Sequence, residues 1–187
     1  MPSATTLSPL DWIQAGFRTL TTDGVDRVKV EPLAQSLGVS KGSFYWHFKD
    51  RNALLSDMLQ HWHEAATELI ITVVEQAEGS AQSRLRALVQ RVSDPAPAAY
   101  GGDGVEPAIR AWARHDARAR DAVERVDAQR INYVQSLFRE AGFSKAVSRH
   151  HANTLYATLI GLDTLSGRTD INRVKSLSGV LEALLSH

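Results

Sequence analysis

The stretch that decides the fold is residues 28–55, VKVEPLAQSLGVSKGSFYWHFKDRNALL. Its first part places apolar side chains with the spacing of one helix face, at Val30, Leu33, Ala34 and Leu37. Gly38 supplies the unhindered backbone with which helices commonly stop, and Ser40 stands where a side-chain oxygen can cap a helix beginning at Lys41. The pattern predicts two short helices joined by a tight turn, as in a helix-turn-helix.

The second expected helix, residues 41–48, mixes small, basic and aromatic side chains within two turns. Phe44 and Phe48 are four residues apart and share a face, so we expect them to anchor the helix in the core. The others are left on or near the outside: Lys41, Gly42, Ser43, Tyr45, Trp46 and His47. Glycine, hydroxyl and basic groups suit close approach to DNA phosphates and base edges. An ordinary core helix with an aromatic rim is the alternative interpretation.

Charge indicates a local DNA contact at most. The chain has 21 basic and 21 acidic residues, so its formal net charge gives no sign of nucleic-acid binding. Between residues 41 and 51, however, three cations (Lys41, Lys49 and Arg51) meet the single anion Asp50. Asp50 is also placed to cap a long helix whose N-terminal N–H groups can bind phosphate. We therefore expect a short and focused phosphate contact.

The run LAQSLGVSKGSFYWHFKDRNALL, residues 33–55, resembles the helix-turn-helix signature of the tetracycline-repressor (TetR) family of transcriptional regulators. In that signature a Gly-Val-Ser/Thr turn precedes a recognition helix ending in Tyr-x-His-Phe. The resemblance covers roughly residues 8–60 and implies a DNA-binding domain at 1–50 and a ligand-binding and dimerisation domain at 51–187. It also implies a homodimer that binds a pseudo-palindromic DNA operator, most simply as a repressor. Lys29 replaces the Thr of many members and can reach the same phosphate as a charge.

The remaining chain keeps helical periodicity, which predicts an all-α fold of about nine helices. Ser8 and Pro9 mark the start of a first helix that Gly24 ends. The later helices are expected at 51–79, 80–93, 108–116, 117–142, 144–165 and from Asp170 onward, with Asp116 and Asp170 as caps. The stretch from Asp94 to Pro107 holds three Pro and three Gly and is expected to be an irregular loop.

Polar and aromatic residues recur on the helices of the C-terminal part. Those expected to enclose one interior are Trp62, Tyr100, Trp112, His115, Tyr133, Phe138 and Tyr156. The family resemblance makes this interior a pocket for an unknown small-molecule effector; alternatively, the same side chains simply fill a core. Arg130 falls on an apolar stripe, so we expect it to pair with a carboxylate such as Asp127 or Asp116, or to line a polar cavity.

The last two expected helices are apolar over more than one face and therefore need a partner. Members of the TetR family dimerise by packing two such helices from each subunit into a four-helix bundle, and two-fold pairing suits a pseudo-palindromic operator. The resemblance thus implies a homodimer through these helices.

Several function classes lack support in the sequence. There is no Cys for a disulfide or thiolate metal site, and the His pairs at 61/63 and 150/151 lack ligand spacing, so we expect no metal and no cofactor. No catalytic motif is present, so an enzyme is not expected. The N-terminal residues have no long apolar run, which favours a cytoplasmic protein without a membrane span. Two alternatives stay open: a helical small-molecule-binding protein or enzyme that does not bind DNA, and an adaptor that joins another protein through its terminal helices.

Overall fold

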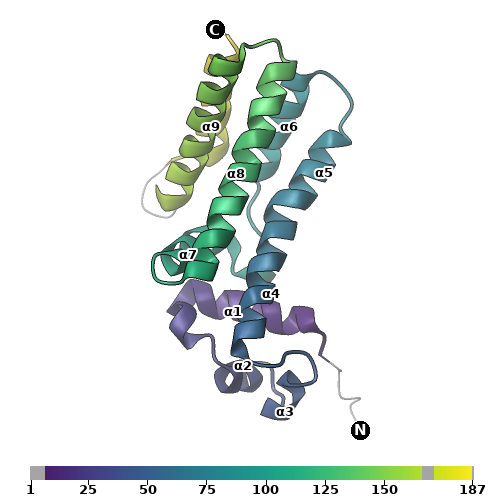
Figure 1. The fold of residues 1–187 in the computed structure, drawn as a ribbon, viewed down its shortest axis with the longest axis vertical. Coiled ribbons are helices and arrows are strands. Elements are labelled where there is room, and N and C mark those ends of the chain that lie inside the picture. Colours follow the sequence, from purple (N-terminus) through teal and green to yellow (C-terminus); the bar gives the residue numbers. More distant parts are fainter. Residues whose placement is uncertain (1–6, 166–170, 187) are drawn as a thin grey trace. The chain divides into compact units, whose positions relative to one another are not determined.

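The computed structural model describes residues 7–165 and 171–186 of the 187-residue chain. Every regular element in these residues is helical, which confirms the predicted all-α class (Figure 1). Ten α-helical segments are present besides short 3-10 turns, and a π-helical turn joins α4 and α5 into one helix. The chain divides into two compact units, Met1–Trp62 with Ala96–Ala122 and His63–Pro95 with Val123–His187. The functional boundary expected after residue 50 remains a prediction.

The first unit begins with α1, Pro9–Asp23, whose ends follow the predicted signals. A capping box closes its start, because Asp11 N–H donates to Ser8 Oγ and Ser8 N–H donates to the Asp11 carboxylate. Gly24, at φ 80°, ends it and donates its N–H to Leu20 O. Gly16 lies so close to α4 that an added Cβ would stand 2.6 Å from Met58 Sδ, so α1 and α4 pack in close contact.

The helix-turn-helix consists of α2, Val30–Ser36, and α3, Lys41–Phe44. Gly38 has φ 68°, its N–H donates to Gln35 O, and Val39 N–H donates to Ala34 O. These two backbone hydrogen bonds form a Schellman motif, which needs the left-handed conformation that glycine adopts readily. The predicted glycine stop is therefore confirmed.

Helix α3 is shorter than the eight residues expected. Its α-helical part ends at Phe44, and the chain continues to His47 as turns closed by Tyr45 N–H to Gly42 O and His47 N–H to Phe44 O. Such i−3 bonds tighten a helix end and use carbonyls that would otherwise lack donors. Phe48 N–H still donates to Phe44 O, at 3.0 Å, so the two Phe side chains remain on one face.

Helix α4, Arg51–His63, starts as predicted at the Asp50 cap, whose Oδ1 accepts from Ala53 N–H at 2.9 Å. A π-helical turn, Glu64–Glu68, follows without interruption and leads into α5, Leu69–Glu75. The expected long helix is therefore present, with one irregular turn. A π-helical turn is rare and is often associated with function, so its contacts are described below.

Residues 96–122 complete the first unit. The 3-10 turns Ala98–Tyr100 and Gly102–Gly104 lie against α1, where Arg18 Nη1 donates to Ala99 O. The Tyr100 ring also stacks on His61, a residue of Arg51–His63, at 5.1 Å. Helix α7, Val105–Ala113, begins before the expected position. The expectation of a loop up to Pro107 was wrong because proline fits the first turn of a helix, where its missing N–H has no intrahelical partner.

The second unit is a helical bundle, with α5, α6, α8 and α9 running side by side in Figure 1. Its helices are α6, Ala81–Ser93; α9, Lys145–Leu165; α10, Arg173–Leu185; and most of α8, Ala117–Glu140. Leu85, Leu137, Phe138, Leu155 and Leu177 are among the buried residues of its core. Asn172 caps α10, whereas the predicted cap Asp170 lies outside the described residues. Among the helices that the structure describes, none has the length and apolar character needed to cross a membrane.

Candidate nucleic-acid interface

The segment Lys41–Lys49, here called the reading segment, is held by its two phenylalanines. Phe44 and Phe48 are buried and stacked with ring centroids 5.3 Å apart. The ring of Trp12, on α1, meets Phe44 edge-on at 5.2 Å. Three aromatic rings from two elements therefore fix the backbone of the reading segment against the first unit.

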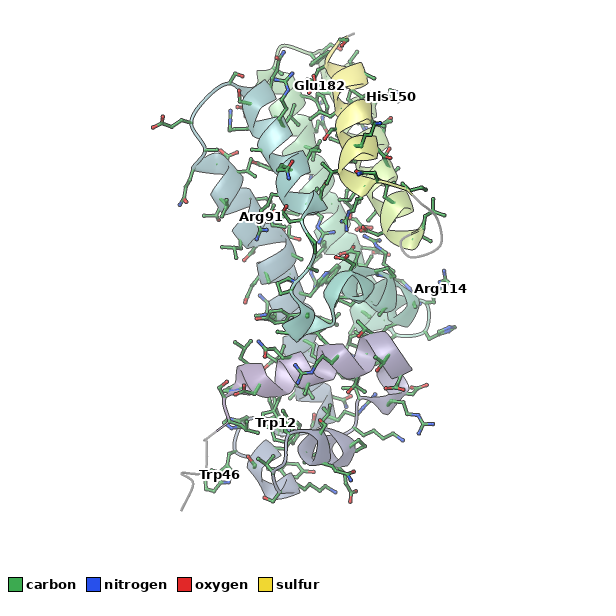
Figure 2. All side chains as sticks on the ribbon, turned by 180° about the vertical axis from the view of Figure 1, so that it is seen from behind. Trp12, Trp46, Arg91, Arg114, His150 and Glu182 are labelled. Carbon is green, nitrogen blue, oxygen red and sulfur yellow. The ribbon has the colours of Figure 1, made fainter. Side chains whose placement is uncertain are left out.

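The other side chains of the reading segment point to solvent, as the spacing predicted. Trp46 is 88% exposed and Tyr45 is 54% exposed, although both are large aromatic residues. Lys41, Gly42 and Lys49 are exposed, and Ser43 and His47 are half-buried. Figure 2 shows Trp46 at the edge of the first unit, with Trp12 inside it. An outward indole at this exposure contributes little to the core and is available to a partner.

The cations of this surface are available to phosphate. Lys41 and Lys49 form no ion pair with any residue in the described ranges. Lys29 is also exposed and occupies the N-cap position of α2, where its main-chain carbonyl accepts from Leu33 N–H. The predicted side-chain cap at Ser40 is wrong, because its exposed side chain makes no capping hydrogen bond to α3. Its hydroxyl lies beside Lys41 in the chain and adds a donor to the same surface.

Arg51 lies at the edge of this surface and has structural partners. Its Nε donates to Val28 O and its Nη2 to Val25 O, both at 2.6 Å, so the guanidinium ties the start of α4 to the residues before α2. The Asp50 carboxylate meanwhile accepts from Ala53 N–H and adds a negative charge at the N-terminus of α4. A phosphate there would have to compete with this carboxylate, so a phosphate contact by Arg51 remains a prediction.

Comparison with known proteins identifies this half of the first unit. Residues 13–58 match the family described as "Bacterial regulatory proteins, tetR family". Over these residues the N-terminal head is similar to the tetR family. The resemblance inferred from the sequence is thus confirmed, and the match includes the reading segment, α2 and most of α4.

Two curated proteins of the tetR family support this assignment over a limited length. The HTH-type transcriptional regulator AcrR of Shigella flexneri is 28% identical over 80 residues, which are 43% of this chain and 37% of that protein. The class A tetracycline repressor protein from transposon 1721 of Escherichia coli is 38% identical over 56 residues, 30% of this chain and 26% of that protein. The matches therefore span well under two thirds of either relative.

Solved structures extend the likeness to the whole fold. A TetR-family transcriptional regulator from Streptomyces coelicolor superposes with a TM-score of 0.79, covering 96% of this chain and 89% of that chain at 16% identity. At this identity the likeness shows the fold alone. The arrangement of a helix-turn-helix head followed by a helical body is therefore that of solved tetR-family proteins.

The eight predicted effector residues divide equally between the two compact units. Trp62, Tyr100, Trp112 and His115 belong to the first unit, and Arg130, Tyr133, Phe138 and Tyr156 belong to the second. In the first unit, Trp62 Nε1 donates to Glu106 Oε2 at 3.1 Å, and His115 is exposed. An effector role for these residues remains a prediction.

Trp112 instead has a partner at the start of α8. Its side chain hydrogen-bonds to the Asp116 carboxylate, which also accepts from the Arg118 guanidinium and from the backbone N–H of Arg118 and Ala119. The Arg118 hydrogen bond is the largest cause that lowers the pKa of Asp116 to about 2, and burial opposes it. The predicted Asp116 cap is confirmed, and it is also a junction of side chains.

In the second unit, Phe138 and Tyr133 have different surroundings. Phe138 is fully buried, and its ring meets Phe143 at 5.8 Å and His151 at 5.2 Å. The Tyr133 hydroxyl donates to Glu75 at 2.7 Å; burial first, and then this hydrogen bond and the Glu75 charge, raise the pKa of Tyr133. Phe138 therefore serves the core, and Tyr133 links α8 to α5.

Arg130 and Tyr156 do come together. Arg130 Nη1 lies 3.4 Å from the Tyr156 hydroxyl, which donates to Asp127 Oδ1 at 2.6 Å. Arg130 also donates from Nε to Thr67 Oγ1 at 3.0 Å and from Nη2 to Ala66 O at 3.1 Å. Tyr156 thus bridges Arg130 and Asp127, while a direct pair between Arg130 and a carboxylate remains a prediction. Thr67 is a partner that the sequence pattern did not indicate. We call Thr67, Asp127, Arg130 and Tyr156 the polar cluster.

Proposed function

We propose that this chain is a DNA-binding transcriptional regulator that represses its target by binding a pseudo-palindromic operator as a homodimer in the cytoplasm. The observation that carries the proposal is the outward display of Lys41, Tyr45 and Trp46 over a buried pair of phenylalanines. Packing explains the buried rings, and the half-exposed Tyr45 ring also meets Phe44 edge-on at 5.3 Å. The Trp46 ring makes no ring contact with any other described residue. Repression is favoured by the similarity to the tetracycline repressor protein.

Within this proposal, the cations and hydroxyls of the reading segment and Lys29 bind phosphates, and Trp46 contacts the edges of the bases. Lys29, Lys41 and Lys49 supply charge, and Ser43 with Tyr45 supplies hydroxyl donors. His47 is half-buried, and its ring meets the ring of Phe48 at 6.5 Å. Trp46 offers an apolar plane suited to the thymine methyl group.

The homodimer is assigned to the last two helices. Large apolar side chains are exposed there, namely Val147 and Leu165 on α9 and Val174 on α10. A second copy of the same surface is the simplest cover for them, and two heads on one two-fold axis match two half-sites of an operator. A small molecule bound in the C-terminal part would then release or engage DNA by its different affinities for two states.

The decisive experiment measures binding of labelled DNA fragments that tile the region upstream of the chain's own gene, at several salt concentrations. We expect a specific fragment to bind, and Lys41→Ala to weaken it about tenfold and to reduce the salt slope by about one. The matched control is Arg114→Ala, which removes one exposed cation far from Trp46 in Figure 2.

Equal behaviour of Lys41→Ala and the wild-type chain would remove the reading segment from the interface. Light scattering on the same samples should give the mass of two subunits. Failure to bind any fragment, with normal folding, would instead favour a helical ligand-binding protein or enzyme.

A further inference from the structure

The polar cluster includes Thr67, which lies in the only π-helical turn of the described residues. Glu64–Glu68 follows α4 directly, and Leu69 N–H donates to Glu64 O across five residues. A π turn contains more residues per turn than an α-helix and persists where side-chain contacts favour it. The contacts of these five residues therefore need an explanation beyond helix propensity.

Two consecutive residues of α8 contact this turn and the residue before it. Gln129 Oε1 lies 2.6 Å from Nε2 of His63, the residue just before the turn. Arg130 donates to Ala66 O and to Thr67 Oγ1, inside the turn. Thr67 is 1% exposed, so its hydroxyl has no access to solvent and depends on protein partners.

The same guanidinium extends the contacts to α9. Arg130 Nη1 approaches the Tyr156 hydroxyl, and this hydroxyl donates to Asp127 on α8. Tyr156 is buried, so a change in its position must be transmitted to its hydrogen-bonded neighbours. One continuous series of hydrogen bonds therefore joins α9 to the π-helical turn through Arg130.

We propose that this series is a conformational switch, in which Arg130 clamps Glu64–Glu68 in its π-helical form and Tyr156 controls the clamp. Release of the clamp lets the turn relax toward an α-helix. A change of one residue per turn shifts the helical phase on one side of the turn against the other by about 100°, since an α-helix has 3.6 residues per turn. The turn thus has two packed alternatives, as a switch requires.

The local part of the switch is tested by amide hydrogen exchange in the full chain. We expect Thr67→Val and Tyr156→Phe, which each remove one hydroxyl, to speed exchange of the amides at 64–70 about fivefold, the effect of one net hydrogen bond of about 1 kcal/mol. Thr158→Val is the matched control, because its hydroxyl donates to Thr154 O elsewhere in the same unit, and it should leave these amides unchanged.

Each outcome decides one part of the proposal. Unchanged exchange in Thr67→Val overturns the clamp, and Thr67→Ser, which keeps the hydroxyl, should restore the wild-type rate if Thr67→Val folds poorly. Faster exchange in Thr67→Val with no effect of Tyr156→Phe overturns the control by Tyr156.

The regulatory part rests on the proposed function and uses the DNA fragment that binds the wild-type chain. We expect Tyr156→Phe to change DNA affinity at least fivefold while Thr158→Val changes it less than twofold. Equal affinities of the two variants overturn the link to DNA. If the wild-type chain binds no fragment, the proposed function fails, while the exchange result still decides the clamp.

Discussion

The reading segment and the polar cluster place the same kinds of side chain in opposite ways. In the reading segment two phenylalanines point inward, while a lysine, a tyrosine and a tryptophan point outward. In the polar cluster the hydroxyls of Thr67 and Tyr156 are buried beside Arg130. Buried polar groups need hydrogen-bond partners within the protein, so the polar cluster has a structural role. The Trp46 ring is 88% exposed and adds little to internal packing, so the reading segment is the surface to test for a partner.

The largest effect is expected for Phe44→Ala. Phe44 is fully buried between Trp12 and Phe48, and removing such a ring typically costs about 3 to 5 kcal/mol of unfolding free energy. Denaturant unfolding should show this loss, and DNA binding should disappear with the fold of the first unit. A variant that stays stable would show that the reading segment does not depend on its buried face.

A smaller loss is expected for Arg130→Met, which keeps much of the side-chain volume. The substitution removes the donors to Thr67 Oγ1 and Ala66 O, and leaving buried acceptors unsatisfied should lower the unfolding free energy by about 2 to 4 kcal/mol. Arg139→Met, on the exposed part of the same helix, is the control and should change it by under about 0.5 kcal/mol. Equal losses in the two variants would mean that the hydrogen bonds of the polar cluster add no stability beyond that of an exposed arginine.

Asp116→Asn tests a carboxylate with structural partners in the same unit as the reading segment. The folded pKa of about 2 lies below the ordinary value of 3.8, so the stabilisation is fully present above about pH 4 and is lost as pH falls toward 2. We expect the variant to lose at most about 2 kcal/mol at neutral pH and to be less sensitive than the wild-type chain between pH 4 and 2. The test is to measure the unfolding midpoints of the variant and of the wild-type chain across this pH range. Parallel pH profiles of the two chains would contradict the prediction.

The smallest effect on stability is expected for Trp46→Ala, which should change the unfolding free energy by less than about 0.5 kcal/mol because the ring is 88% exposed. The same variant should weaken binding to the DNA fragment, at about the cost of one mismatched base pair, 1 to 3 kcal/mol. Stability measured beside DNA affinity separates the two roles. A large loss of stability would show that Trp46 has a structural role, and the contrast between the reading segment and the polar cluster would then fail.

Local signals in the sequence predicted most of the fold. Ser8, Gly24, Gly38, Asp50 and Asp116 act on residues one to four positions away, and each ends or caps a helix as expected. The four-residue spacing of Phe44 and Phe48 also correctly predicted that both side chains are buried in the first unit. These successes share a cause, since helix ends and helix faces are decided by near neighbours in the chain.

The predictions that depended on distant contacts fared less well. The turn Glu64–Glu68 has ordinary helical composition, whereas Arg130, which contacts it, and Gln129, which contacts the preceding His63, lie more than 60 residues away in the sequence. The eight predicted effector residues fall into the two compact units, four in each, and their effector role remains a prediction. Long-range hydrogen bonds leave no pattern in a single sequence, so such features appear only when the fold is known.

The tryptophans of this chain also differ in a way that can be observed by light. Trp12, Trp62 and Trp112 are buried, whereas the fourth, Trp46, is surrounded by water at the tip of the reading segment. A solvated indole emits at longer wavelengths and is open to quenching by acrylamide. An unlabelled sample therefore carries its own fluorescent reporter, and stacking or shielding of that one ring would shift its emission while the three interior rings keep theirs.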